Sequence, residues 1–228
     1  MRRKWRTSGL LSTSYRRRLL DRDLREASAS LRGVVLDLGG EWRSRRGTFR
    51  PPQRADLLWL CLNLDSGVAP DIVADVEAVP CRDACADAVV CTELLEHVLR
   101  PGQVLHECAR LLKPGGRLIL SMPFLVRVHP DPDDYQRFTA SKLIDMVTNA
   151  DLVVDKVRPQ GLYFTVLADM LKVLVRELRP RLLRWAVGAL ALPVFAGMIW
   201  LEERTALAAS ALISSYTTGF FVLAHKRV

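Results

Sequence analysis

Acidic side chains follow the apolar runs of this chain at the places where strands of a sheet would end. Because ligands bind beyond the carboxyl ends of parallel strands, acids in these places predict a binding site along one edge of a sheet. Carboxylates there can accept charge-assisted hydrogen bonds from the hydroxyl or amino groups of a ligand. The four acids are Asp37, Asp65, Asp75 (with Val76 beside it) and Glu93.

Two of these acids have a purely structural alternative. Asp65 ends the apolar run LLWLCLNL, residues 57–64, and a carboxylate there can accept both hydroxyls of a ribose. The alternative is a turn residue before Ser66-Gly67. Asp75 ends a shorter run, residues 71–76, and its alternative is a cap at the end of that strand.

Residues 123–139, PFLVRVHPDPDDYQRFT, hold a second group of reactive side chains. The segment follows a predicted strand at the open edge of the site, where acceptor-binding loops lie, and its prolines stiffen it. His129 could remove the proton of a hydroxyl group, with an aspartate to orient the imidazole. Tyr135 and Phe138 could stack on a sugar or another ring, and Arg137 lies between them in the sequence.

The same segment also has a structural interpretation. Asp133, Asp134 and Thr139 could cap a helix that the pattern predicts over residues 140–149. Capping and substrate contact can coexist, so we expect a mixed role. His97 follows another predicted strand and is the reserve base, with a structural role in a helix as its alternative.

The middle of the chain has the pattern of a βαβ unit. Residues 88–91 are an uninterrupted apolar run, which is typical of a strand buried on both faces. Apolar residues recur at helical spacing over residues 104–112, and the PGG of residues 114–116 is predicted to stop that helix. Residues 117–122 supply the next strand. A strand, a crossover helix and a parallel strand predict an α/β fold.

The motifs VVLDLGG, DIVADVEAVP, CTELLEHV and LxxxxRxLKPGGRLxxxxP, in this order, resemble those of the class I S-adenosylmethionine-dependent methyltransferases. Within that group the chain is most similar to the small-molecule branch described as methyltransferase type 11. The resemblance covers residues 34–157 and a last strand at 218–226. It implies a Rossmann-like sheet, mostly parallel with an antiparallel last strand, and S-adenosyl-L-methionine as the cofactor.

The resemblance also implies roles for the residues that match its motifs. Asp37 would help to hold the amino-acid part of the cofactor, and Gly39 would let the backbone approach it. Asp75 matches the acid near the adenine amino group, and we expect Glu93 near the cofactor as well. The expected cofactor-binding set is Asp37, Gly39, Gly40, Asp65, Asp75, Val76 and Glu93.

The glycine-rich turn departs from the family pattern. Glu41 and Arg43 stand where the second and third glycines would be. The departure concerns the geometry of the loop and motivates a second hypothesis, in which the chain is a cofactor-free methyltransferase-like module that docks on a membrane or a partner enzyme. A nicotinamide cofactor is disfavoured because no GxGxxG motif is present.

The charge is divided unevenly along the 228 residues, with +10 over residues 1–54, −8 over 55–155 and +6 over 156–228. An acidic middle disfavours a nucleic-acid groove through the site. The segment after residues 88–91 also lacks the Asn/Asp-Pro-Pro-aromatic clamp found in enzymes that methylate base amino groups. Nucleic-acid methylation is therefore the third and weakest hypothesis. The basic ends fit better with an anionic surface.

The five cysteines do not form a disulfide framework. Cys61 and Cys91 lie in apolar strand patterns and Cys108 lies on the predicted helix, so we expect reduced core residues. Cys81 and Cys85 have no histidine neighbours that would suggest zinc. The sequence therefore predicts a cytoplasmic protein without a structural metal.

The two basic ends could both contact a membrane surface. Residues 16–27 could form an amphipathic helix among arginines, or a leading helix that packs its leucines on the domain. Residues 182–201 are about as long and apolar as a transmembrane helix, but one full crossing would separate the last strand from its sheet. An interfacial or re-entrant hairpin satisfies both constraints. The alternative is a soluble lid over the cleft.

The expected organisation has four parts: a basic helical arm at 1–30, a Rossmann-like core at 31–161, an apolar helical insertion at 162–214 and the last strand at 215–228. The expected function is methyl transfer to an oxygen, or as second choice a nitrogen, of a small or lipid-linked acceptor such as a glycan or cell-envelope precursor. His129 and His97 would be the catalytic residues. Tyr135, Arg137 and Phe138 would contact the substrate.

Overall fold

The computed structural model describes residues 13–42, 47–129, 133–204 and 206–228. The helices are α1 (Tyr15–Ser28), α2 (Pro101–Leu111), α3 (Ala140–Asn149), α4 (Tyr163–Glu177), α5 (Arg181–Arg204) and α6 (Ala211–Ser214), with 3-10 turns η1 (Ser66–Val68), η2 (Leu95–His97) and η3 (Ala206–Ala209). The strands are β1 (Gly33–Leu38), β2 (Leu57–Asn63), β3 (Ile72–Val73), β4 (Ala86–Thr92), β5 (Leu112–Pro123), β6 (Leu152–Pro159) and β7 (Gly219–Lys226).

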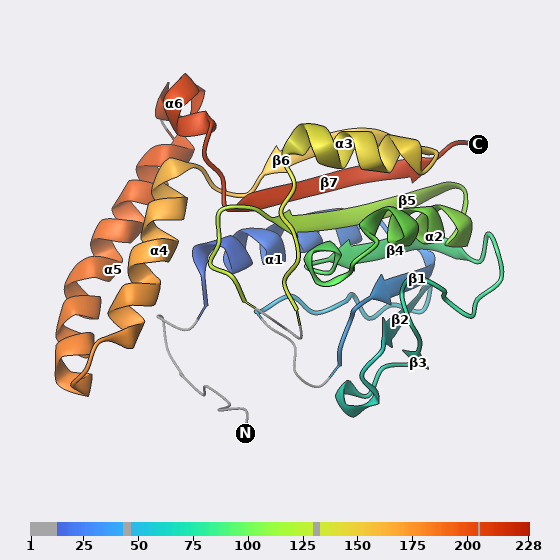
Figure 1. Ribbon diagram of the computed structural model, residues 1–228, viewed down its shortest axis with the longest axis horizontal. Coiled ribbons are helices and arrows are strands. Elements are labelled where there is room, and N and C mark those ends of the chain that lie inside the picture. The colour runs from blue at the N-terminus through green and yellow to red at the C-terminus, as the bar shows by residue number, and fades with distance from the viewer. Residues whose placement is uncertain (1–12, 43–46, 130–132, 205) are drawn as a thin grey trace.

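The strands described form one sheet in the order β3-β2-β1-β4-β5-β7-β6 (Figure 1). Strands β1 to β5 are parallel to one another, and β7 lies antiparallel between β5 and β6. This is the mostly parallel sheet with an antiparallel last strand that the sequence predicts. The predicted fold class is therefore confirmed.

Helices cover both faces of the sheet because successive strand residues point to opposite sides. Leu36 of β1 packs in the larger core beneath α2 and α3, whereas its neighbour Val35 packs in a second core beneath α1. Leu20 and Leu24 of α1 are 0% and 3% exposed in that second core. The leucines of the basic leading helix are therefore turned towards the domain. The side chains of Cys61, Cys91 and Cys108 are buried in the two cores, as predicted.

The LKPGG motif does not lie where the sequence pattern places it. Helix α2 ends at Leu111, ahead of the proline, and β5 already begins at Leu112. Leu112 pairs with Ala86, and the next registered pair is Arg117 with Ala88, so the motif forms an irregularity inside the strand. The PGG of residues 114–116, predicted to stop the helix, thus lies in a bulge of β5. Glycine and proline are also common at bulges in strands.

The residues between β6 and β7 form a helical hairpin that stands beside the sheet. Helices α4 and α5 contact each other along their lengths at one end of the molecule (left in Figure 1). The buried Glu202 carboxylate near the end of α5 accepts hydrogen bonds from the backbone N–H groups of Leu162 (2.7 Å) and Phe164 (2.6 Å) at the start of α4. This contact satisfies orphan donors of α4 and fixes the base of the hairpin.

Candidate functional site

The carboxyl ends of β1, β2 and β4 lie side by side. Leu38 is in register with Leu62 on one side and with Cys91 on the other. The residues that follow these strands, Gly39 among them, therefore meet at one edge of the sheet. The structure thus brings together the strand ends that carry the predicted cofactor residues.

The glycine turn after β1 requires both of its glycines. Gly39 has φ +74°, a conformation that favours glycine, and a Cβ at Gly40 would lie 2.6 Å from Cγ of Asp37. The side-chain amide of Asn63 donates to the carbonyl oxygens of Gly39 and Gly40, both at 3.2 Å. Glu41 follows in the described chain, whereas Arg43 lies outside the described residues. The turn therefore has two glycines, Gly39 and Gly40, where the family pattern has three spaced glycines.

Asp37 is turned towards β2. Its carboxylate accepts a hydrogen bond from the indole N–H of Trp59 at 3.1 Å, and the residue is only 9% exposed. Its backbone carbonyl accepts from the N–H of Gly40 at 3.1 Å. The geometry gives Asp37 a role in holding the glycine turn in shape.

Asp65 and Asp75 both lie exposed at strand ends. One carboxylate oxygen of each accepts a backbone N–H two residues further on, from Gly67 at 2.8 Å and from Glu77 at 2.9 Å. The structural roles considered from the sequence, a turn residue for Asp65 and a strand-end cap for Asp75, are therefore consistent with these contacts. It coexists with exposure to a ligand, and Val76 beside Asp75 is buried and 8% exposed.

Glu93 forms a largely buried ion pair with Arg16, a residue that sequence reasoning did not connect with the site; the side chains are 23% and 5% exposed. One guanidinium nitrogen of Arg16 lies 2.6 Å from Oε1 of Glu93, the other contacts Oε2, and Ser121 donates to Oε1 at 2.8 Å. Burial alone would raise the pKa of Glu93, but the Arg16 charge and these hydrogen bonds lower it. Glu93 therefore stays ionised, and its φ of 54° marks a strained turn after β4.

The loop after β5 is fixed onto η2. The side-chain amide of Gln136 donates to the carbonyl oxygens of Leu95 (2.9 Å) and Val98 (2.7 Å). The N–H of Tyr135 donates to the carbonyl of Glu96 at 2.8 Å. The predicted acceptor segment and the predicted reserve base therefore lie next to each other.

Asp134 organises this loop. Its carboxylate accepts from the N–H of His129 at 2.9 Å and pairs with the guanidinium of Arg137, one nitrogen of which lies 2.6 Å away. Hydrogen bonding from Arg137 holds the pKa of Asp134 well below its usual range. The cap of α3 is instead Thr139, whose hydroxyl accepts from the N–H of Lys142 at 3.4 Å. Asp134 therefore holds the loop rather than the helix.

The three predicted substrate residues lie in different environments. Tyr135 is 47% exposed, and its hydroxyl donates to the Asp133 carboxylate at 3.0 Å. Arg137 is partly buried against Asp134, and Phe138 packs against the larger core. Tyr135 is thus the most accessible of the three. Asp131 of the same segment lies outside the described residues.

His97, His129 and Glu96 gather beneath this loop. The two imidazole rings meet edge to face with centroids 5.4 Å apart, and Nε2 of His97 lies 3.7 Å from Oε1 of Glu96. Burial lowers the pKa of His129, so its imidazole is neutral and can accept a proton at pH 7. One ligand atom from each of the three residues lies within 4.8 Å of the others, a spacing that could also hold a cation.

Glu96 is the buried acid that sequence reasoning missed. It is 0% exposed, and neither carboxylate oxygen has a hydrogen-bond partner among the described residues. Burial, with the nearby charge of Glu93, raises the pKa of Glu96 to about 8. The carboxyl group is therefore protonated at neutral pH.

Replacing Glu96 with glutamine is expected to change how stability depends on pH. Between pH 4.5, the ordinary pKa, and about 8, the folded state keeps a proton that the unfolded state releases, so the free energy of unfolding of the wild type falls as pH rises. Over this pH range the wild type loses as much as about 4 kcal/mol of its free energy of unfolding, and Glu96→Gln, which cannot ionise, does not. Relative to wild type, the variant should gain roughly 10 °C in melting temperature between pH 5 and pH 9.

Thermal unfolding followed by circular dichroism over this pH range measures the effect. The matched control is Glu203→Gln, because Glu203 is a carboxylate on α5 with a side chain 47% exposed. A constant difference between Glu96→Gln and wild type at all pH values would contradict the assignment of a buried protonated acid.

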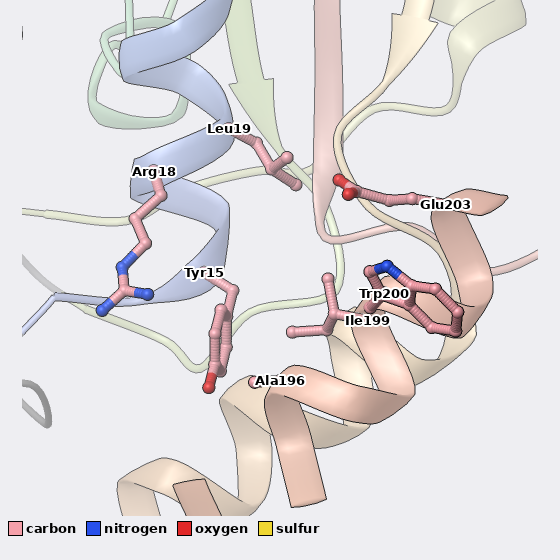
Figure 2. A pocket seen from close by; sticks show the side chains of 7 residues that line it. All are labelled: Tyr15, Arg18, Leu19, Ala196, Ile199, Trp200 and Glu203. Atoms are coloured by element: carbon pink, nitrogen blue, oxygen red, sulfur yellow. The ribbon is translucent and has the colours of Figure 1, made fainter. Parts of the chain in front are cut away.

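Two small cavities lie outside the strand-end site. The first, of about 250 Å³, lies between α1 and α5; Figure 2 shows Tyr15 and Leu19 of α1 opposite Ile199 and Trp200 of α5. The second, of about 230 Å³, lies beside the loop after β5 and is lined in part by Tyr135. The chemical groups identify the strand edge, not the cavity between the helices, as the candidate active site.

Comparisons with known proteins agree with this geometry. Residues 61–120 match a family model described as a methyltransferase domain. The structure is similar over 95% of this chain and 80% of the other to 1,6-didemethyltoxoflavin-N1-methyltransferase of Burkholderia thailandensis, with a TM-score of 0.53 and 14% identity. The chain has the class I methyltransferase fold.

Two further likenesses show how far this methyltransferase fold constrains function. The [4+2]-cyclase SpnF is similar over 98% of this chain and 86% of its own, with a TM-score of 0.54 and 15% identity. A ubiquinone biosynthesis O-methyltransferase of Xanthomonas axonopodis is 49% identical over 61 residues, 26% of this chain and 26% of that protein. The chain thus matches about a quarter of the length of this curated relative. The same fold supports different activities, so function must be argued from the site.

Proposed function

We propose that this protein is an S-adenosylmethionine-dependent methyltransferase that acts on an oxygen of a small or lipid-linked acceptor. The observation that carries the proposal is the order of groups along the strand ends. A glycine turn follows β1, the exposed Asp65 follows β2 and the exposed Asp75 follows β3. This order suits the amino-acid part, the ribose and the adenine of one extended ligand.

The residues present fit S-adenosylmethionine. Gly39 offers a backbone without Cβ, where a side chain would meet Cδ1 of Leu94 at 3.0 Å. Asp65 would accept the ribose hydroxyls, and Asp75 would face the adenine amino group. Glu93, held in place by Arg16, would lie near the cofactor. When bound, the cofactor supplies an activated methyl group on its sulfonium.

The chain's own contribution to the reaction is alignment of the acceptor. The loop after β5 is held on η2 by Gln136 and by the Asp134–Arg137 pair, so it can present the acceptor in line with the methyl group. His129, with its lowered pKa, would take the proton of the acceptor hydroxyl. His97 is the reserve base, and Tyr135 would stack on the acceptor ring.

Two likenesses support the proposed acceptor class. The local relatives are named O-methyltransferases of ubiquinone biosynthesis, which favours oxygen over nitrogen as the methylated atom. Residues 129–139, HPDPDDYQRFT, resemble the H-x-x-D-x-x-D-Y-x-R-F-T segment of methyltransferases found beside glycan and cell-envelope functions. We therefore propose a hydroxylated envelope precursor or glycan, and a cytoplasmic protein in peripheral contact with the inner face of the membrane.

The alternative is a methyltransferase-like module without catalytic activity, which docks on a membrane or a partner enzyme. The observation that favours it is Glu41, which follows Gly39-Gly40 where further glycines would be expected. The two functions differ in one respect that is simple to measure, since the module would not bind the cofactor.

Replacing His129 with glutamine is expected to lower the turnover number about 100-fold, which is the usual contribution of a general base. Binding of S-adenosylhomocysteine should not change, because His129 lies in the acceptor loop. The assay measures S-adenosylhomocysteine released in the presence of hydroxylated lipid and glycan precursors, first with wild type and then with the variant.

The matched variant is His97→Gln, for which we expect a loss of less than 10-fold. If His97→Gln lost 100-fold and His129→Gln kept full activity, the roles of the two histidines would be reversed. If no tested acceptor supported release by a protein that binds the cofactor, the proposed acceptor class would be wrong.

A further inference from the structure

The surface of the α4–α5 hairpin, residues 163–204, is unlike the rest of the protein. Among the described residues, only helix α5 is long and apolar enough to cross a membrane, with a mean hydropathy of 1.8 over its best 18-residue window, of which 11% is buried. Leu182 and Leu190 are 83% and 76% exposed, and Trp185 is 56% exposed. A large apolar surface in contact with water indicates an interaction site.

Basic residues predominate at the tip of the hairpin. Arg179, Arg181 and Arg184 lie at the turn and at the start of α5, where the exposed Glu177 at the end of α4 is the nearby acid, and residues 178–201 contain no acid. The acids of α5 are at its far end, where Glu202 is used to cap α4. An apolar helix face with arginines at one end suits an anionic lipid surface, in which the apolar side chains enter the acyl boundary and the arginines meet the headgroups.

The hairpin is also placed at the edge that carries the site. It leaves the sheet after Pro159, the end of β6, and the chain returns at Gly219, which pairs with Pro123 at the end of β5. The carboxyl ends of the parallel strands therefore face the side on which the hairpin stands (Figure 1). A molecule held in a bilayer beneath the hairpin would present its headgroup to this edge.

Hydrogen bonds connect the hairpin to the site. The carboxylate of Asp169 in α4 accepts the backbone N–H groups of Tyr15 (2.7 Å) and Arg16 (2.9 Å) at the start of α1. The side chain of Arg16 in turn holds Glu93 at the end of β4. The hairpin is thus positioned rigidly with respect to the strand ends and is not a free appendage.

We propose that the outer face of α5 is a docking surface for an anionic phospholipid bilayer, on which the helix lies without crossing. This inference rests on one part of the proposed function, the peripheral contact with the membrane. It does not depend on the cofactor or on the acceptor. A full crossing is disfavoured because β7, which follows the hairpin, is paired on both sides within the sheet. The two helices return to the same edge, so the hairpin can lie in the interface with its base on the domain.

Vesicle co-sedimentation tests this surface without cofactor or acceptor. Wild-type protein should bind vesicles of equal parts phosphatidylglycerol and phosphatidylcholine at least 10-fold more tightly than vesicles of phosphatidylcholine alone. The double variant Leu182→Glu/Leu190→Glu should lose about 100-fold of this affinity. Arg181→Gln/Arg184→Gln should lose about 30-fold, since each basic residue near an anionic surface contributes roughly 1 kcal/mol and about 1.4 kcal/mol corresponds to a factor of 10.

The matched control is Leu58→Glu, because Leu58 is a leucine of β2 that is 53% exposed and distant from the hairpin in the chain. It should bind vesicles like wild type. Circular dichroism of each variant verifies that it is folded, and the arginine pair tests the surface even if the glutamates disturb the hairpin.

Three results would overturn the proposal. The first is wild-type protein that stays in the supernatant with both kinds of vesicle, and the second is a glutamate variant that binds vesicles as well as wild type. The third is a wild-type dimer in sedimentation velocity that Leu182→Glu/Leu190→Glu dissociates, which would identify a second copy as the occupant. A protein that binds cofactor but no vesicles would refute only the docking surface, and one that binds vesicles but no cofactor would refute only the enzyme.

Discussion

Replacing Asp65 with alanine is expected to weaken the binding of S-adenosylhomocysteine about 100-fold. The reason is that a carboxylate at the end of β2 would accept both ribose hydroxyls, and each hydrogen bond to a charged group contributes about 1.5–3 kcal/mol. The fold should be unaffected, because Asp65 is exposed and its main internal contact is the N–H of Gly67 at 2.8 Å. Calorimetric titration measures the change.

Two further variants sharpen this result. Asp65→Asn keeps the size of the side chain and one acceptor oxygen, so an intermediate loss is expected. Asp145→Ala removes an exposed acid of α3 that is paired with Lys142, and it should bind like wild type. Equal affinity of Asp65→Ala and wild type would mean that the ribose lies elsewhere.

Replacing Arg16 with methionine is expected to destabilise the protein by about 3 kcal/mol. The substitution keeps the aliphatic bulk of a side chain that is 5% exposed, but it leaves the Glu93 carboxylate at the end of β4 without its cation. Breaking a buried ion pair from one side is costly because the remaining charge is uncompensated. The melting temperature should fall by roughly 5–10 °C, as measured by thermal unfolding at pH 7.

The double variant Arg16→Met/Glu93→Gln separates this cause from a packing defect. It removes both charges, so it should recover most of the lost stability. Arg22→Met is the control on the same helix, since its side chain is 55% exposed, and it should be close to neutral. A double variant no more stable than Arg16→Met would show that packing, not the orphaned charge, causes the loss.

The sheet could be predicted because its strands carry strong local signals. The apolar runs of residues 57–64 and 88–91 coincide with β2 and β4, and the last strand predicted at residues 218–226 coincides with β7. The LKPGG motif was misplaced because proline and glycine stop a helix and also form a bulge, and only the pairing of Leu112 with Ala86 distinguishes the two. Local sequence does not contain that pairing.

The site was predictable only where its residues follow strands directly. Asp65, Asp75 and Glu93 stand at strand ends, so topology brings them to one edge. Arg16 could not be found in this way because 77 residues separate it from Glu93, and on its helix it resembles the other arginines. Glu96 was missed for a similar reason, since only tertiary packing buries it.

The most direct test of the account is a calorimetric titration of the wild-type protein with S-adenosylhomocysteine. A turn with two glycines, followed by exposed acids at the ends of β2 and β3, predicts binding of one ligand per chain with micromolar affinity. Failure of the folded protein to bind would contradict the proposal of a methyltransferase. The docking module would then be the function that the remaining observations support.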